Sequence, residues 1–137
     1  MNDAKHLPTA LIADDVSKQH DTGPGHPECV ARFDAVMEAI KQADYTESLL
    51  HLKPRPATAK EIKACHHPDY ITVAQRDIAA GLDMLSTGDT TVCRQSLEPA
   101  LHAAGGVCVA VDAVFAGKAK NAFCVHRPPG HHATPDT

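Results

Sequence analysis

Short apolar segments alternate with longer amphipathic segments along the whole chain, and this alternation is the strongest constraint on its fold. Segments 10–13, 49–52 and 122–125 are short and apolar, and proline or charged residues follow them, as is typical of strands. The segments between them carry apolar residues at spacings of three and four, as helices do. No linker or repeat interrupts the pattern. We therefore predict one α/β domain over residues 1–137 with a largely parallel sheet.

Three helices are expected in the first two thirds of the chain from their boundary signals. Pro27 suits the first turn of one helix, and Thr58 with Glu61 forms a capping-box pattern at the start of a second. A third is expected over residues 70–80, where Gly81 ends it. The first helix would bury a stripe made of Val30, Phe33, Val36, Met37 and Ile40.

The longest helix is expected over residues 96–116, with Ser96 as its N-cap and Gly117 as its stop. Small residues at 103–106 would let it lie close to the sheet at some cost in helix propensity. Its expected buried stripe consists of Leu97, Leu101, Ala104, Val107, Val111, Val114 and Phe115.

The heptad that spells RPPGHHA, residues 127–133, presents two adjacent imidazoles directly after a strand predicted to be buried on both faces. Its two prolines fix their own φ, and Gly130 permits a turn that a side chain would obstruct. Active sites of α/β proteins lie on loops at the carboxyl ends of strands. A histidine there can take a proton from water and return it to a leaving amine. A His-His pair taken alone is also typical of a solvated loop or a weak metal contact.

The heptad resembles a signature of the histone deacetylase superfamily, which also includes acetylpolyamine amidohydrolases and acetoin-utilisation proteins. Three segments upstream of the heptad also resemble segments of that family, and they occur in the same order: 23–28 (GPGHPE) with Arg32 after it, 67–71 (HPDYI) and 88–90 (GDT). The resemblance covers essentially the whole chain. It implies the N-terminal part of a three-layer, deacetylase-like α/β fold, from a family of zinc-dependent hydrolases that act on acetyl-lysine or acetylpolyamine amides.

The resemblance also implies roles for individual residues. His131 would contact a metal-bound water, and His132 would transfer a proton or stabilise charge. Arg32 would line an internal channel, while Asp89 and Gly130 would contact the substrate. Without the resemblance, the segment around Asp89 is interpreted as a polar turn.

Zinc is a cofactor of the parent family, but its protein ligands there lie downstream of the tandem histidines. The five cysteines show no C-x-x-C spacing, and Asp136 is a single carboxylate near His132. We therefore expect no metal ligands and no bound zinc in this chain alone. Two functions remain open: a truncated acetyl-amide hydrolase, whose activity in isolation is uncertain, and a non-catalytic module that associates with itself.

A chain that stops at Thr137 would leave one sheet edge and some apolar helix surface uncovered. We expect a homodimer, or a missing C-terminal half, to cover them. A small acetylated amide is the expected substrate if the protein is active.

Charge and composition exclude some partners. The net charge is −4 and no lysine-arginine cluster occurs, which argues against nucleic acid as a partner. We see no apolar run of membrane-spanning length and expect no membrane partner. Met1–His6 lacks the apolar core of a secretory signal. An odd number of unpatterned cysteines suits a reducing compartment, so we expect a cytoplasmic protein.

Overall fold

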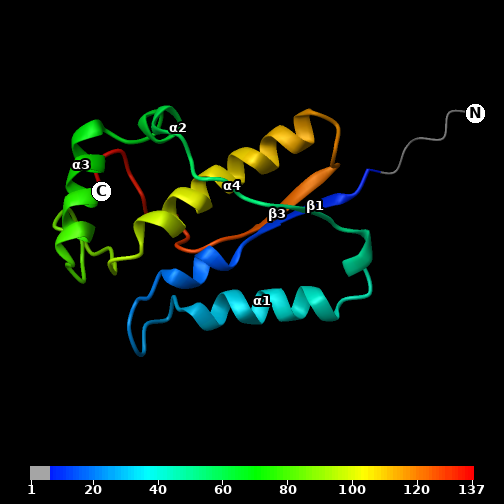
Figure 1. Ribbon diagram of the computed structural model, residues 1–137, viewed down its shortest axis with the longest axis horizontal. Helices are drawn as coiled ribbons and strands as arrows, with labels where there is room; N and C mark the ends of the chain where they lie inside the picture. The colour runs from blue at the N-terminus through cyan, green and yellow to red at the C-terminus, as the bar shows by residue number, and fades with distance from the viewer. Residues whose placement is uncertain (1–6) are drawn as a thin grey trace, which may run out of the picture.

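A three-stranded parallel sheet lies at the centre of the computed structural model, which describes residues 7–137 (Figure 1). The strands are β1 (Thr9–Ala13), β2 (Leu50–Leu52) and β3 (Asn121–Val125), in the order β2-β1-β3. The predicted parallel α/β architecture is therefore confirmed. The stretch Met1–His6, which we expected to lack a secretory signal, lies outside the described residues.

Residues 7–137 form four α-helices, α1 (Val30–Gln42), α2 (Ala59–Lys63), α3 (Pro68–Ala80) and α4 (Leu97–Phe115), with short 3-10 turns η1 (Asp15–Gln19) and η2 (Thr46–Ser48). The predicted capping box is present, because the Glu61 amide donates to Thr58 Oγ1 at 3.2 Å and the Thr58 amide donates to Glu61 Oε2 at 2.7 Å. Gly81 ends α3 with a left-handed φ of 77°, as predicted.

Two helix starts differ from the predictions. α1 begins at Val30 rather than near Pro27, since the preceding loop is held in non-helical geometry: the Glu28 amide donates to His26 Nδ1 at 3.0 Å. α3 begins at Pro68 and not at residue 70, because the His67 ring accepts a hydrogen bond from the Asp69 amide and caps the helix.

The two faces of β1 are buried under different helices, which makes a three-layer structure. Ala10 and Ile12 point toward α4, where they pack with Ala110. Leu11 points the opposite way, against Phe33 of α1. This alternation follows from the two-residue period of a strand. α1 and α4 accordingly lie on opposite sides of the strands in Figure 1.

The predicted buried stripe of α4 is confirmed in part: Leu97 and Val114 are half-buried against core clusters, but three of its other large residues are exposed. Val107 and Val111 are each 49% exposed, and Phe115 is 90% exposed. The helix instead buries Pro99 and a set of small residues, Gly105, Gly106, Ala110 and Ala113. The cause is a close crossing by the segment that leads from β2 to α2 (Figure 1), where the Ala57 amide donates to the Leu101 carbonyl at 2.9 Å.

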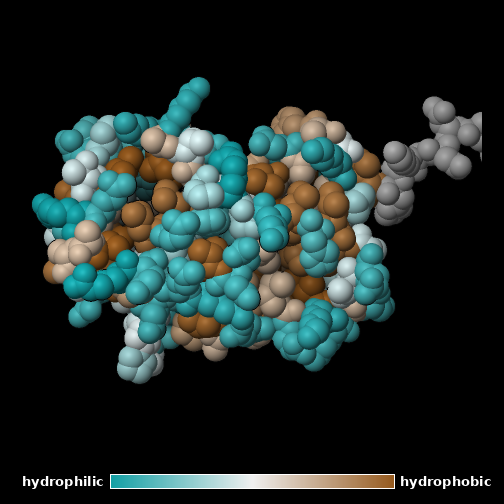
Figure 2. Space-filling model, in the orientation of Figure 1, coloured by the Kyte–Doolittle hydropathy of each residue, from teal (hydrophilic) through white to brown (hydrophobic). Residues whose placement is uncertain are grey.

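β3 is less buried than its sequence predicts. Ala122 and Cys124 pack against the core on one face, but Phe123 on the other face is 53% exposed, so the expectation of burial on both faces is wrong. Within residues 7–137, β3 pairs with β1 along one edge, and no strand pairs with its other edge. In the view of Figure 2, hydrophobic side chains also reach the surface around the C-terminal half of α4.

α4 also corrects the expectation about membrane-spanning length. Its 19 residues are long and apolar enough to cross a bilayer by length and composition alone. In this fold one face of the helix packs on the sheet through Ala110.

Candidate functional site

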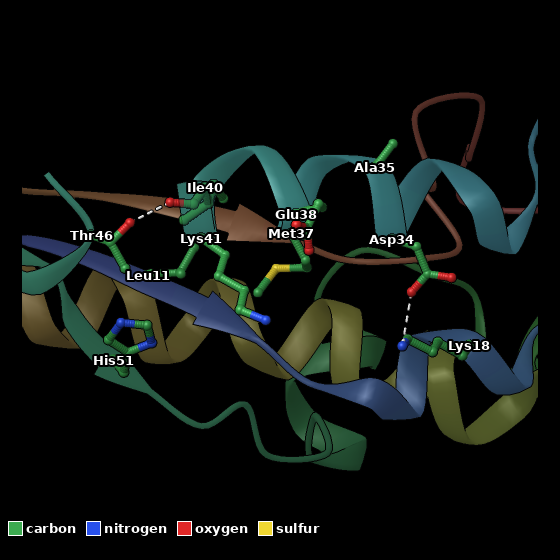
Figure 3. A pocket seen from close by; sticks show the side chains of 10 residues that line it. All are labelled: Leu11, Lys18, Asp34, Ala35, Met37, Glu38, Ile40, Lys41, Thr46 and His51. Atoms are coloured by element: carbon green, nitrogen blue, oxygen red, sulfur yellow. Dashed lines mark hydrogen bonds and ion pairs between the residues drawn. The ribbon is translucent and has the colours of Figure 1, made fainter. Parts of the chain in front are cut away.

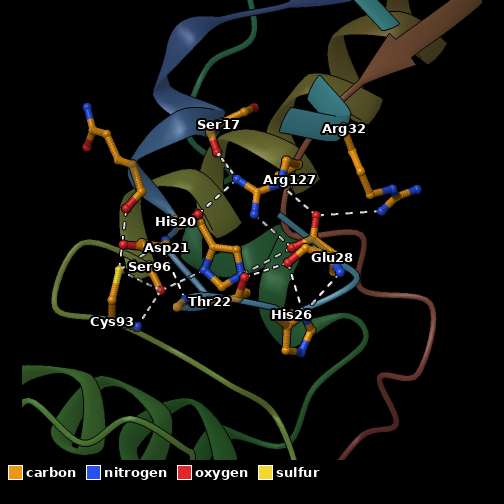
Figure 4. A network of polar contacts seen from close by, with 12 residues as sticks. Ser17, His20, Asp21, Thr22, His26, Glu28, Arg32, Cys93, Ser96 and Arg127 are labelled. Atoms are coloured by element: carbon orange, nitrogen blue, oxygen red, sulfur yellow. Dashed lines mark hydrogen bonds and ion pairs between the residues drawn. The ribbon is translucent and has the colours of Figure 1, made fainter. Parts of the chain in front are cut away.

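Arg127, at the base of the tandem-histidine loop, is buried with its side chain only 3% exposed. Its guanidinium donates to both carboxylate oxygens of Glu28, from Nε at 2.6 Å and from Nη2 at 2.9 Å. Nη1 donates to the carbonyls of Ser17 at 3.1 Å and His20 at 2.8 Å (Figure 4). This forked geometry is the strongest arrangement for an arginine-carboxylate pair. The loop base is therefore tied to a segment about one hundred positions earlier in the sequence.

His20 and Ser96 continue this arrangement on the other side of Glu28. His20 Nδ1 lies 2.7 Å from Ser96 Oγ, and His20 Nε2 lies 3.7 Å from Glu28 Oε2. Ser17, His20, Glu28, Ser96 and Arg127 are hereafter called the anchor cluster.

Ser96 does not cap α4 with its side chain as predicted. It stands at the N-cap position, but its hydroxyl oxygen accepts a hydrogen bond from the Cys93 amide at 2.8 Å and contacts His20. The Cys93 thiol is partly buried, which would raise its pKa, but hydrogen bonds from Ser96 and the Asp21 amide outweigh burial and lower the pKa.

Two histidines, the buried His20 and the half-buried His126, make stability depend on pH. Burial lowers the pKa of His20, and the nearby charge of Arg127 lowers it further; burial and His102 do the same for His126. The folded chain then binds fewer protons than the unfolded chain. The contribution of these two histidines to stability is therefore fully present above pH 6.5, the ordinary pKa of histidine, and is lost as the pH falls below it.

We expect a lower urea midpoint at pH 5.5 than at pH 7.5. The variant His126→Leu should weaken this dependence and the exposed His51→Leu should not. Equal midpoints at both pH values in the wild-type protein would contradict the assignment.

His131 and His132 lie at the exposed tip of the loop whose base Arg127 holds. Their ring centroids are 4.2 Å apart with an interplanar angle of 51°, and Gly130 before them has a left-handed φ of 70°. The residues after them return toward α3, since the His67 amide donates to the Pro135 carbonyl at 2.9 Å. The fold therefore places the predicted HPDYI segment beside the tail that follows the tandem histidines.

Arg32 lies on α1 on the other side of Glu28 from His20. Its side chain is 60% exposed, and Nη1 is 3.6 Å from Glu28 Oε1. A small cavity of about 170 Å³ runs along the end of β3, where Arg32, Phe33 and Arg127 are among the lining residues. The structure thus brings Arg32 close to the loop base. Its predicted role as a channel residue stays a prediction.

Asp89 lies on a separate loop, residues 82–91, that returns on itself through a hydrogen bond from the Leu85 amide to the Thr90 carbonyl at 2.9 Å. Its side chain is exposed. Among residues 7–137, it forms no hydrogen bond or ion pair with His131 or His132. Its predicted contact with substrate stays a prediction.

Asp77 of α3 anchors the middle of the loop that carries Asp89. Its buried carboxylate accepts hydrogen bonds from the Ser86 hydroxyl at 2.6 Å and the Ser86 amide at 2.9 Å. These bonds, with Arg76, lower the pKa of Asp77 to about 2. The carboxylate therefore stabilises the fold above pH 3.8, and this contribution is lost as the pH falls toward 2.

We expect Asp77→Asn to lower the urea midpoint at pH 6 and to increase proteolysis within loop 82–91. The difference in urea midpoint between Asp77→Asn and the wild-type chain should narrow as the pH is lowered from 6 toward 3. Asp83→Asn, an exposed carboxylate on the same loop, is the control and should behave as wild type. A constant difference at all pH values would show that the charge of Asp77 is not what holds the loop.

A groove of about 680 Å³ lies elsewhere, between α1, β1 and β2 (Figure 3). Leu11, Met37 and Ile40 are among its apolar lining residues, and Lys18 is paired with Asp34 at its edge. None of the predicted site residues lines it. The residues that the sequence predicted for the site therefore lie away from this larger groove.

The described residues do not form a ligand set for a metal ion. Among residues 7–137, no three His, Cys, Asp or Glu side chains lie close enough together to hold one. Asp136, which the sequence placed near His132, is exposed, and its amide donates to Thr134 Oγ1.

Comparisons with known proteins decide the family. A sequence-family model for the histone deacetylase domain matches residues 26–137. The chain belongs to the histone deacetylase family. The resemblance inferred from the RPPGHHA heptad and its upstream segments is thereby confirmed.

Individual deacetylase relatives match most of this chain but little of their own length. A probable deacetylase of Archaeoglobus fulgidus is 30% identical over 131 residues, which are 93% of this chain and 35% of that protein. Histone deacetylase 5 of Arabidopsis thaliana is 29% identical over 92% of this chain and 20% of its own. The crystal structure of the HDA15 HD domain has a TM-score of 0.85 at 26% identity, over 95% of this chain and 38% of that chain. The chain thus spans less than two fifths of each.

The anchor cluster is the part of this deacetylase-family site that sequence reasoning missed. Glu28 lies within the GPGHPE segment and Arg127 begins the RPPGHHA heptad, but the two residues were not predicted to meet. His20 was not singled out in the sequence. One signal could have indicated the pair: Glu28 and Arg127 are charged residues inside the two segments that most resemble the family.

Proposed function

We propose that this chain forms the part of a hydrolytic deacetylase domain that carries the proton-transfer histidines, and that the complete domain cleaves acetyl amides such as acetyl-lysine or acetylated polyamines. One observation carries the proposal. In a chain of the histone deacetylase family, two adjacent imidazoles stand exposed on a loop whose base is fixed by the buried Arg127–Glu28 pair.

Amide hydrolysis needs one group to remove a proton from the attacking water and one to protonate the departing amine. His131 and His132 can divide these tasks because each ring can take or give a proton near neutral pH. The exposed rings are accessible to a substrate, and Gly130 before them adopts the left-handed φ of 70° that the turn requires. Arg32 would then lie along the path to the loop base, and Asp89 would hold the substrate backbone.

The zinc ion implied by the family resemblance does not fit residues 7–137, since they contain no ligand set for it. In the proposed complete domain, other residues would supply its ligands. The proton chemistry assigned to His131 and His132 does not require either ring to bind the metal.

The surface along β3 and α4 is where the polypeptide that completes the domain would dock. The outer edge of β3 has no strand partner within residues 7–137, and Phe123, Val107, Val111 and Phe115 beside it expose apolar side chains. Exposed apolar surface and open strand edges favour association. Covering Phe115 alone would contribute about 1.5–3 kcal/mol. The chain spans 38% of its structural neighbour, which leaves a large segment of the neighbour's domain with no counterpart here.

Light scattering after size-exclusion chromatography tests this surface. We expect a 1:1 complex when the chain is mixed with the remaining segment of a related deacetylase domain, and Val111→Asp should weaken it. Ala39→Asp, on the exposed side of α1, is the control. If this chain instead forms a dimer that is dissociated by Val111→Asp but not by the added segment, the partner at this surface is a second copy of the chain. A monomer that binds nothing would contradict the proposed docking surface.

Turnover of an acetyl-lysine peptide and of an acetylated polyamine tests the activity itself. The chain with its completing segment, supplied with zinc, should release acetate from at least one of them, and the preferred substrate identifies the substrate class. If acetate is not released from either substrate by a complex shown to form, the chain is not part of an acetyl-amide hydrolase.

A further inference from the structure

The anchor cluster lies beneath the tandem-histidine loop and takes no part in the proton chemistry proposed above. Arg127 makes four hydrogen bonds within it, two to Glu28 and one each to the carbonyls of Ser17 and His20. Arg127 also begins the loop, so its side chain and the backbone that leads to His131 share one Cα atom. Any rotation at this residue moves the imidazoles.

Glu28 is the carboxylate on which the arrangement depends. Its side chain is 15% exposed and faces donors from three parts of the chain: Arg127 after β3, Arg32 on α1 at 3.6 Å, and His20 after η1 at 3.7 Å. Both carboxylate oxygens accept from Arg127, which fixes the guanidinium plane as well as its position. A single-point contact would leave that plane free to turn.

We propose that Glu28 is the positioning residue of the tandem-histidine loop, acting through Arg127 to fix the direction in which His131 and His132 point. The effect on the direction of the loop stands on the geometry alone, while its effect on turnover rests on the proposed function.

Small changes at Glu28 have distinct expected effects. Glu28→Gln keeps the shape but places an amide N–H₂ against one arginine N–H, so one bond of the fork is replaced by two donors facing each other. Glu28→Asp keeps the charge but is one methylene shorter, so it can reach Arg127 with one oxygen more easily than with two. The fork is lost in both variants, and the charge is kept only in the second.

Backbone relaxation measured by NMR on the 137-residue chain tests the effect on the loop. In the wild-type chain, we expect order parameters of about 0.8 at residues 130–133 and in β1. In Glu28→Gln, the loop values should fall below about 0.6, while those in β1 stay unchanged. Glu38→Gln, an exposed glutamate on α1, is the control. If Glu28→Gln fails to fold, Glu28→Asp takes its place with a smaller expected fall.

The proposal would be overturned if the order parameters of residues 130–133 are unchanged in a folded Glu28 variant, or if they are already low in the wild-type chain. A residue that only stabilised the fold would change neither loop nor strand order as long as the protein remained folded.

Kinetics in the completed domain separate this proposal from the proposed function. Glu28→Gln should lower kcat by about 10- to 100-fold with KM changed less than about twofold, since a misdirected catalytic group costs rate more than binding. Glu28→Asp should recover part of kcat. If the completed domain shows no turnover, the proposed function fails and the relaxation result still stands. If turnover occurs and kcat is unchanged by Glu28→Gln, the positioning role fails.

Discussion

Replacement of Arg127 by methionine is expected to lower the free energy of unfolding by about 3–5 kcal/mol. Methionine has a similar length but no donors, so Glu28 would lose both fork bonds in a site where its side chain is only 15% exposed. The carbonyls of Ser17 and His20 would lose their donor as well. A partly buried charge without its partner costs far more than a lost surface ion pair. Urea denaturation followed by circular dichroism measures the difference.

Arg94→Met is the matched control for this prediction. Arg94 is exposed, and its guanidinium donates a hydrogen bond from Nη1 to the Ala79 carbonyl at 3.1 Å. Its replacement should cost no more than about 1 kcal/mol. A similar loss of stability in both variants would mean that the buried fork at Arg127 is not an important contributor to the fold.

Gly105→Ala should be the second most disruptive small change, at about 3 kcal/mol. A Cβ at this position would overlap the Arg55 carbonyl oxygen and would lie 2.6 Å from the Ala57 amide nitrogen and 2.7 Å from the Pro56 carbonyl carbon. These are backbone atoms of the segment that crosses α4, so no side chain can turn aside to make room. The helix propensity gained by alanine, about 1 kcal/mol, is too small to compensate.

Gly88→Ala is the control, because nothing lies within 4 Å of the place that its Cβ would occupy and its φ is not left-handed. It should leave the urea midpoint unchanged or raise the stability by about 0.5 kcal/mol. If Gly105→Ala proves as harmless as Gly88→Ala, the segment from Arg55 to Ala57 does not cross α4 as closely as described.

Local sequence signals predicted the fold well where the physics is local. The capping box at Thr58 and Glu61 and the left-handed stop at Gly81 depend on a few neighbouring residues, and both are present. The loop that carries His131 and His132 was predicted from its prolines, its glycine and the strand before it. The parallel sheet followed from the alternation of strands and helices.

The buried face of α4 could not be predicted from periodicity alone. This helix is apolar on most of its surface, so the spacing of Val107, Val111 and Phe115 fits a buried stripe as well as an exposed one. The deciding factor was side-chain size where the crossing segment meets the helix, since its backbone leaves no room for a Cβ at Gly105. The anchor cluster was missed for a different reason, since Glu28 and Arg127 are 99 positions apart and their contact depends on the whole fold.

The most direct test of the assignment to a deacetylase is the rate of acetate release by the completed domain when the two loop histidines are changed one at a time. We predict that His131→Ala and His132→Ala each lower kcat by about 10²- to 10⁴-fold, while His51→Ala, an exposed histidine far along the chain, leaves it unchanged. Wild-type rates in both loop variants would contradict the assignment of proton transfer to these residues.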